Sequence, residues 1–195
     1  MYQHYHNKFQ RNVSIIHPGE YYATREHSII STVLGSCVAV ALYDPKNRFA
    51  GLNHFMLPGR LGPNNLAGSD TGKYGIFAME FLVNEMIKLG AKKGDLVAKV
   101  FGGGHVLNRT VDNGGSIPSS NVTFAFEYLR TEGIKVQSSD VGGTIARKIF
   151  LEPETFKVWL KRITGKLIVD VEQEEKEYLE KLKKPAKPAE EVTFF

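Results

Sequence analysis

The sequence is poor in cysteine, and Cys37 is the only one among 195 residues. A single thiol cannot form a disulfide within the chain, and a Cys-x-x-Cys pair for zinc or redox chemistry is excluded as well. The chain must therefore fold on its hydrophobic core, which a content of 42% hydrophobic residues allows. A lone free thiol favours a reducing compartment, and we expect a cytoplasmic location.

Long hydrophobic runs and an excess of one charge are missing too. No stretch approaches the roughly 18 apolar residues of a membrane-spanning helix. The polar start MYQHYHNKFQ lacks the apolar centre of a signal peptide. The formal net charge is only +4, and the one dense lysine cluster, EKLKKPAKP, includes an acidic residue. These features predict no membrane insertion, and they favour a solvated tail over a nucleic-acid surface.

Clusters of metal ligands are also scarce. His4 and His6 form a closely spaced pair, but they lie in a polar segment, and the sequence predicts no metal site and no cofactor. We expect residues 1–12 to be disordered and residues 13–171 to form one folded domain. Residues 172–195 are expected to form a charged tail that opens as an exposed helix.

Strand and helix signals alternate through the body of the chain. The glycine-rich segment at residues 62–72 predicts a loop long enough to have a function beyond connecting two elements. Helical spacing of apolar residues predicts helices at 76–90 and 121–133. β-branched and apolar segments predict strands at 28–34, 37–43, 48–57, 96–101, 134–138, 146–151, 156–163 and 166–171. The pattern indicates an α+β fold, a layered core of mixed β-sheet packed with two main helices.

A predicted hairpin brings the only cysteine toward a histidine. The segment DPKN, residues 44–47, is typical of a four-residue turn. If Tyr43 pairs with Arg48, the same register places Cys37 opposite His54. Directly opposed side chains share a face, with Cβ atoms about 4.5–5.5 Å apart. This register predicts a thiol and an imidazole within reach of a hydrogen bond.

A thiol and an imidazole at this spacing can act as nucleophile and base. The imidazolium lowers the pKa of the thiol, the thiolate attacks a carbonyl carbon, and His54 protonates the leaving amine. Gly35 and Ser36 precede Cys37, and their backbone N–H groups are candidates for binding the developing oxyanion. Against this, Cys37 lies in an apolar strand, and both residues are also typical of a buried core. The residues alone leave the two interpretations open.

A second glycine-rich segment, VFGGGH at residues 100–105, has two interpretations. Three glycines after a strand are compatible with a phosphate-binding loop, but the Walker lysine is missing and no helix signal follows directly. We therefore expect a tight turn beside the site at Cys37.

The segment LGSCVAVALYDPKNRFAGLNHFMLP, residues 34–58, resembles the signature of the CheD family, the chemoreceptor glutamine deamidases of bacterial chemotaxis. Further similar segments are HPGEYYAT, KYGIFAMEFLVNEMIKLGA, AKVFGGG and SSDVGGTIARKIFLEPET. The resemblance implies a fold like that of toxin-type cysteine deamidases, with a Cys-His-Thr triad. By position, Cys37 is the nucleophile and His54 the base. The third member lies six residues before the cysteine, at Ser31, with the neighbouring Thr32 as the alternative.

The resemblance also implies a substrate and partners. A family member hydrolyses glutamine side-chain amides on the cytoplasmic helices of methyl-accepting chemoreceptors, giving glutamate and ammonia through a cysteine thioester. The new glutamates are methylation sites that tune adaptation. A CheC-type phosphatase is implied as a further partner. Two alternatives are a non-catalytic module that docks the phosphatase or the receptor and modulates it, and an unrelated cysteine hydrolase of small amides.

Overall fold

Two five-stranded sheets form the body of the protein in the computed structural model, which describes residues 1–57, 70–106, 116–164 and 167–183. Both sheets are mixed, because β2 pairs with β4 and β7 with β8 in parallel, whereas the other neighbours are antiparallel. The first sheet contains, in spatial order, β1 (Tyr2–His6), β2 (Arg11–Ile15), β4 (Ile29–Leu34), β9 (Ala146–Glu152) and β10 (Lys157–Ile163). The second contains β3 (Tyr21–Thr24), β6 (Phe49–Asn53), β5 (Val38–Asp44), β7 (Val97–Gly102) and β8 (Lys135–Val141).

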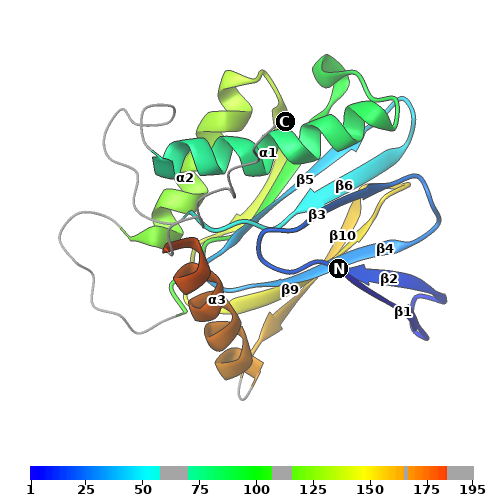
Figure 1. The fold of residues 1–195 in the computed structure, drawn as a ribbon. Helices are drawn as coiled ribbons and strands as arrows, with labels where there is room; N and C mark the ends of the chain where they lie inside the picture. The colour runs from blue at the N-terminus through cyan, green and yellow to red at the C-terminus, as the bar shows by residue number, and fades with distance from the viewer. Residues whose placement is uncertain (58–69, 107–115, 165–166, 184–195) are drawn as a thin grey trace, which may run out of the picture.

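The helices cover one face and one end of these sheets (Figure 1). The two long helices α1 (Asp70–Lys88) and α2 (Ile117–Thr131) pack on the outer face of the second sheet, and α3 (Leu167–Lys183) lies at one end of the two sheets. A short 3₁₀ helix spans Lys93–Asp95. The arrangement confirms the expected α+β class with mixed sheets, but α3 is a third helix of comparable length where two main helices were expected. No helix among the described residues is long and apolar enough to cross a membrane.

Strand β5 is the centre of the core. Val38, Val40 and Leu42 point toward the two long helices, and Ala39 and Ala41 point toward the first sheet. All five are fully buried, as expected for a strand covered on both faces. The small side chains of the inner face let the two sheets approach closely. Cys37 belongs to the same inter-sheet cluster, and its side chain therefore lies between the sheets.

The expected hairpin register is wrong by two residues. Tyr43 pairs with Ala50 rather than with Arg48, and the turn consists of residues 45–48. The cause is Asp44, whose Oδ1 accepts hydrogen bonds from the amides of Lys46 (2.8 Å) and residue 47 (2.9 Å), so that Asp44 ends the strand instead of opening the turn. Arg48 closes the turn in a left-handed conformation, with φ of 55°.

The corrected register changes the neighbour of Cys37 but not the face on which His54 lies. A bridge between Val38 and Phe55 continues the observed pairing, which places Met56 opposite Cys37. A shift of two residues preserves the face, because side chains alternate along a strand with period two. His54 thus remains on the inter-sheet side, one step diagonally from the cysteine.

Two terminal segments differ from the expectation. The N-terminus, expected to be disordered, contains β1 and the start of β2, and Phe9 in the hairpin between them packs on Phe150 and Trp159 at ring distances of 5.2 and 5.1 Å. Of residues 166–171, which were expected to form a strand, residue 166 lies outside the described residues and the others begin α3. Their β-branched residues suggested a strand, but the packing of one helical face onto the body decides the outcome. Residues 58–69, most of the loop expected at 62–72, lie outside the described residues.

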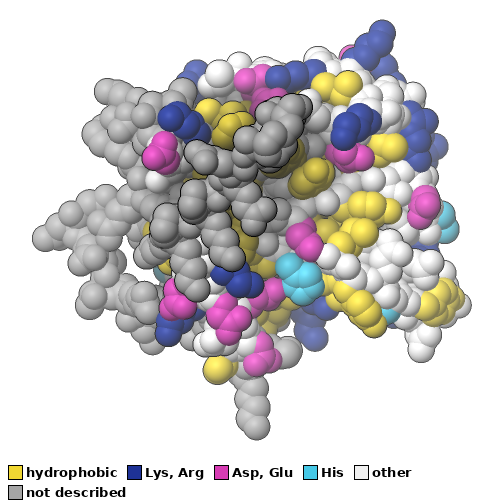
Figure 2. All heavy atoms as spheres, in the orientation of Figure 1, with side chains coloured by type: hydrophobic (Ala, Val, Ile, Leu, Met, Phe, Trp, Pro, Cys, Tyr) yellow, Lys and Arg dark blue, Asp and Glu magenta, His cyan; other side chains and the backbone are white. Residues whose placement is uncertain are grey.

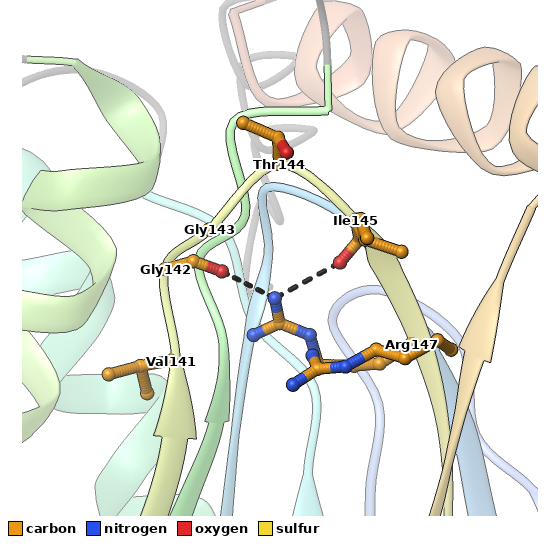
Figure 3. Close-up of a pocket in the computed structure, with 7 residues that line it drawn as sticks. Val141, Gly142, Gly143, Thr144, Ile145 and Arg147 are labelled. Carbon is orange, nitrogen blue, oxygen red and sulfur yellow. Dashed lines mark hydrogen bonds between the residues drawn. The ribbon is translucent and has the colours of Figure 1, made fainter.

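Arg147 anchors the turn that follows β8. Its side chain is 1% exposed, and its guanidinium donates to the carbonyl oxygens of Gly102 (2.7 Å), Gly142 and Ile145 (3.1 Å). Figure 3 shows the guanidinium inside this turn, beside a pocket of about 300 Å³. An ion pair with Asp140 at 3.5 Å balances its charge. Arg147 therefore fixes the end of β7, where the three glycines begin.

Candidate active site

The only cysteine lies where the chain crosses from one sheet to the other. β4 ends at Leu34 in the first sheet, and β5 begins at Val38 in the second. Residues 35–37 form this crossing, and the glycine and serine at its start give it room to turn. These three residues belong to no strand, so their backbone amides are available for partners outside the two sheets.

His54 follows the last residue of β6 and is held by its own backbone. Its amide donates to the carbonyl oxygen of Glu20 at 2.9 Å, and its carbonyl oxygen accepts from the amide of Gly19 at 2.7 Å. The residue is 2% exposed, and Cys37 is fully buried. The segment between β2 and β3 thus fixes the histidine on the inter-sheet side. The expected hydrogen bond between the thiol and the imidazole is not formed in the described residues, because the observed register places Met56 opposite Cys37 and leaves Nε2 without a partner.

Thr32 orients the imidazole of His54. The threonine hydroxyl lies 2.7 Å from His54 Nδ1 and 2.7 Å from the carbonyl oxygen of Ile16. The carbonyl can only accept, so the hydroxyl donates its single proton there and accepts from the N–H of Nδ1. The ring is therefore protonated at Nδ1, which leaves the lone pair of Nε2 free.

Ser31, the expected third member, lies elsewhere. Its hydroxyl donates to the carbonyl oxygen of Ile149 on the adjacent strand β9, at 2.8 Å. The neighbouring residue Thr32, which was the alternative, supplies the hydroxyl that contacts His54. The difference follows from the strand, because successive residues of β4 project to opposite faces and only one face meets the histidine.

The free nitrogen of His54 has the properties of a base. Nε2 is buried and has no hydrogen-bond partner among the described residues. Burial, followed by the charge of His17, lowers the pKa of His54 to about 3, because a buried ring cannot hydrate its charged form. The imidazole is therefore neutral and Nε2 can accept a proton, as a base must, while burial makes it a weaker base than a free histidine.

Three backbone amides converge on one carboxylate beside the cysteine. Glu175 of α3 accepts hydrogen bonds from the amides of Gly35 (3.0 Å), Ser36 (2.9 Å) and Cys37 (3.0 Å), and from the Ser36 hydroxyl (2.6 Å). The carboxylate is itself an oxygen anion, so this crossing binds negative charge on oxygen. An oxyanion hole has the same requirement, and Gly35 and Ser36 were predicted to contribute to one.

The thiol beneath the carboxylate is held in its protonated form. Burial raises the pKa of Cys37, and the negative charge and side-chain hydrogen bond of Glu175 raise it further. Glu174, the neighbouring residue of α3, acts in the same direction. With α3 in this position, Cys37 is a thiol rather than a thiolate.

The three glycines at the end of β7 hold the backbone of residues 35–37 in place. The amides of Gly103 and Gly104 donate to the carbonyl oxygens of Cys37 and Gly35, both at 2.7 Å. A Cβ atom on Gly102, where φ is 108°, would lie 2.1 Å from the carbonyl oxygen of Cys37. Glycine is therefore required for this close backbone approach, as in the tight turn that was expected. The two amides are occupied by the protein, which argues against the phosphate loop.

Asn121 and Glu175 are the functional residues that the sequence did not reveal. Asn121 on α2 is fully buried, donates to the carbonyl oxygen of Ser36 (2.9 Å) and accepts from the amide of Leu57 (2.8 Å), so it ties the crossing to the segment after His54. Its only signal was its position at the start of a predicted helix. Glu175 lay in the segment predicted to be an exposed tail. In the described part of the chain, no group of three or more acidic, histidine or cysteine side chains could hold a metal ion.

Known proteins are similar to this chain over most of its length. The family model described as CheD chemotactic sensory transduction matches residues 56–162. The chain is 46% identical over 164 residues to "Probable chemoreceptor glutamine deamidase CheD 1" of Shewanella oneidensis, covering 83% of this chain and 77% of the relative. It is 39% identical over 173 residues to "Probable chemoreceptor glutamine deamidase CheD" of Hahella chejuensis, covering 88% and 80%.

A solved structure, that of the hypothetical protein YfiH of Bacillus licheniformis, is similar at a TM-score of 0.34 and 17% identity, covering 57% of this chain and 46% of that one.

Proposed function

This chain belongs to the CheD family and is a chemoreceptor glutamine deamidase, and we propose that it works through a thioester on Cys37. The enzyme is an amidohydrolase that converts glutamine side chains of chemoreceptors into glutamates and releases ammonia. The observation that carries the mechanism is the convergence of three amides beside a buried thiol, with His54, whose buried Nε2 has no hydrogen-bond partner among the described residues, on the inter-sheet side of its strand.

The proposed reaction has two halves. His54 Nε2 takes the proton of Cys37, and the thiolate attacks the amide carbon of the glutamine while the amides of residues 35–37 stabilise the oxyanion. The protonated His54 then gives its proton to the leaving nitrogen, the C–N bond breaks, and ammonia leaves a thioester. A water molecule, deprotonated by His54, attacks the thioester, and the C–S bond breaks to release glutamate. The protonated His54 returns its proton to the sulfur, which restores the thiol.

The activity is tested on a purified receptor cytoplasmic domain. Mass spectrometry after incubation with the enzyme should find specific glutamines that have gained the mass difference between an amide and an acid, with ammonia released in equal amount. A sample without enzyme reports spontaneous deamidation. If neither signal exceeds that background, the chain does not act on that receptor, and the proposal fails for it.

Thr32 and Ser31 form a matched pair for testing the orientation of His54. In Thr32→Val, the Nδ1–H of His54 and the carbonyl of Ile16 lose their partner, and we expect kcat to fall about tenfold to a hundredfold, the effect of roughly 1.4–2.7 kcal/mol. Thr32→Ser keeps a hydroxyl and should recover most of the rate. Ser31→Ala removes only the bond to Ile149 and should leave kcat near the wild-type value. A normal rate in Thr32→Val with a low rate in Ser31→Ala would reverse the assignment.

The type of fold, the cellular location and a second partner are also part of this proposal. The layered sheets and helices support a cysteine-hydrolase fold like that of toxin-type deamidases. The deamidase domain extends beyond the expected residues 13–171, because β1 belongs to the first sheet and α3 packs on the body. A single free thiol used as a nucleophile fits the reducing cytoplasm, where receptor signalling helices lie. A CheC-type phosphatase is proposed as a second partner that competes with the receptor for the face at Cys37.

A further inference from the structure

One face of α3 packs onto the active site. Val171, Glu175, Tyr178 and Leu179 follow helical spacing, so they share one side of the helix. Val171 and Glu175 are 7% and 3% exposed, and Tyr178 and Leu179 are partly buried against the inter-sheet core. Figure 2 shows other acidic side chains gathered on the outer surface over α3. The segment expected to be an exposed tail is therefore a docked helix with a buried carboxylate.

The carboxylate of Glu175 is bound only by neutral groups in the described part of the chain. Three amides and one hydroxyl of residues 35–37 donate to it, and the side chain of Cys37 forms a further hydrogen bond with it. A buried carboxylate without a cation is costly, so its position reflects a site built to bind charged oxygen. A Cβ atom on Gly35 would lie 3.0 Å from both carboxylate oxygens, and the glycine thus makes room for this group.

A glutamate side chain on a helix is also what this reaction produces. The enzyme turns a receptor glutamine into a glutamate, and Glu175 places that product group beside Cys37. Resting on the function proposed above, we propose that α3 occupies the place of the receptor substrate helix, with Glu175 where the target glutamine binds. The receptor and α3 then compete for one site, and Glu175 acts there as an analogue of the glutamate that the reaction produces.

The contacts of the two carboxylate oxygens assign the atoms of a bound glutamine. Oε1 accepts from the amides of Gly35 and Cys37. In a bound glutamine, the amide carbonyl oxygen, and later the oxyanion, take the position of Oε1. Oε2 accepts from both the amide and the hydroxyl of Ser36. The hydroxyl can turn to accept from the NH₂ group of an amide, whereas the backbone amide cannot, so a glutamine at this place makes one hydrogen bond fewer than Glu175. The leaving nitrogen therefore takes the place of Oε2.

The flanking contacts of α3 specify the helix that fits. Glu174, one residue before the carboxylate, meets Nδ1 of His17 at 2.6 Å. Tyr178, three residues after it, hydrogen-bonds the hydroxyl of Tyr74 and lies against Gly19. A substrate helix should therefore carry an acidic residue directly before the glutamine, apolar residues four positions to either side, and an amphipathic or aromatic residue three positions after it.

Release of α3 is required before the receptor can react. The thiol has no exposed surface while the helix is docked. The raised pKa of the buried Cys37, to which Glu175 contributes, also keeps the nucleophile protonated in this state. Release of α3 removes the charges of Glu175 and Glu174 from the thiol and takes away the part of its cover that the helix supplies.

The first experiment gives α3 a glutamine at position 175, so that the helix carries the side chain on which the enzyme acts. In Glu175→Gln, we expect Cys37 to attack the side-chain amide of residue 175, with loss of ammonia, and water to cleave the thioester, so that residue 175 becomes glutamate. Mass spectrometry of the α3 peptide follows this conversion. Glu180→Gln, an exposed acid on the same helix, is the matched control and should keep its amide. The double variant Cys37→Ala/Glu175→Gln should also keep its amide.

The rate of this conversion separates the outcomes. If α3 reacts on the active site of its own molecule, the first-order rate constant of the conversion is independent of protein concentration. A rate constant that increases in proportion to protein concentration shows reaction between two molecules and overturns the proposal. If the amide at residue 175 persists while the same protein deamidates a receptor domain, the substrate-like position of α3 is refuted and the proposed function stands. If neither the receptor nor residue 175 is converted, the function itself is refuted.

The second experiment measures access to the thiol. We expect Glu175→Ala to raise the rate of Cys37 alkylation by iodoacetamide, and kcat/KM for the receptor domain, by about tenfold or more, because the competent open population grows. Glu180→Ala should match the wild type in both, and thermal melts of the two variants verify folding. Unchanged alkylation and kcat/KM in Glu175→Ala would show that α3 does not compete with the receptor.

Discussion

Receptor domains incubated with Cys37→Ala should keep their glutamines. Without the sulfur no thioester forms, and the oxyanion site and His54 are left with no nucleophile. We expect kcat to fall by a factor on the order of 10⁴ or more, as for the removal of other catalytic nucleophiles. Mass spectrometry of the receptor domain measures the loss against the wild-type enzyme.

The control for this variant is its stability. Cys37 lies in the inter-sheet core, and alanine removes a single buried sulfur, so we expect the free energy of unfolding to fall by only about 1 kcal/mol. Urea denaturation checks this value. A folded Cys37→Ala that deamidates the receptor at the wild-type rate would refute the covalent mechanism.

Replacing His54 should have the second largest effect. Burial raises the pKa of the Cys37 thiol, which therefore needs a base beside it to react near neutral pH. We expect His54→Gln to lower kcat on the order of a thousandfold or more. The residual rate should increase with rising pH, because hydroxide then replaces the missing base in removing the thiol proton.

A second histidine serves as the comparison for His54. His27 is exposed and contacts Glu154, away from the crossing between the sheets. His27→Gln should therefore retain the wild-type kcat and pH profile. If His54→Gln keeps the wild-type rate, or if its residual rate does not respond to pH, the assignment of His54 as the base is wrong.

The sequence predicted the elements of the body better than their register. The strands around Cys37 and the two long helices follow from apolar periodicity, which depends on nearby residues only. The pairing of Tyr43 was wrong because one side chain, Asp44, binds the turn amides and moves the turn along the chain. The face of His54 was nevertheless correct, since the shift was an even number of residues.

The choice between Ser31 and Thr32 depended on information that a single strand does not contain. Both carry hydroxyls, and only the packing of the two sheets decides which one meets the histidine. The position of Glu175 was harder still, because 138 residues separate it from its contact with Cys37. Its charged surroundings are typical of a solvated helix, and only the helical spacing of Val171, Tyr178 and Leu179 hinted at a buried face.

The burial of Cys37 under α3 also bears on the lifetime of the enzyme. Peroxide oxidises a cysteine through its thiolate and must touch the sulfur to do so. With the helix docked, the sulfur is both protonated and fully enclosed. A deamidase waiting for receptor is in this way protected against oxidative inactivation, and its nucleophile becomes vulnerable only during the intervals in which it works.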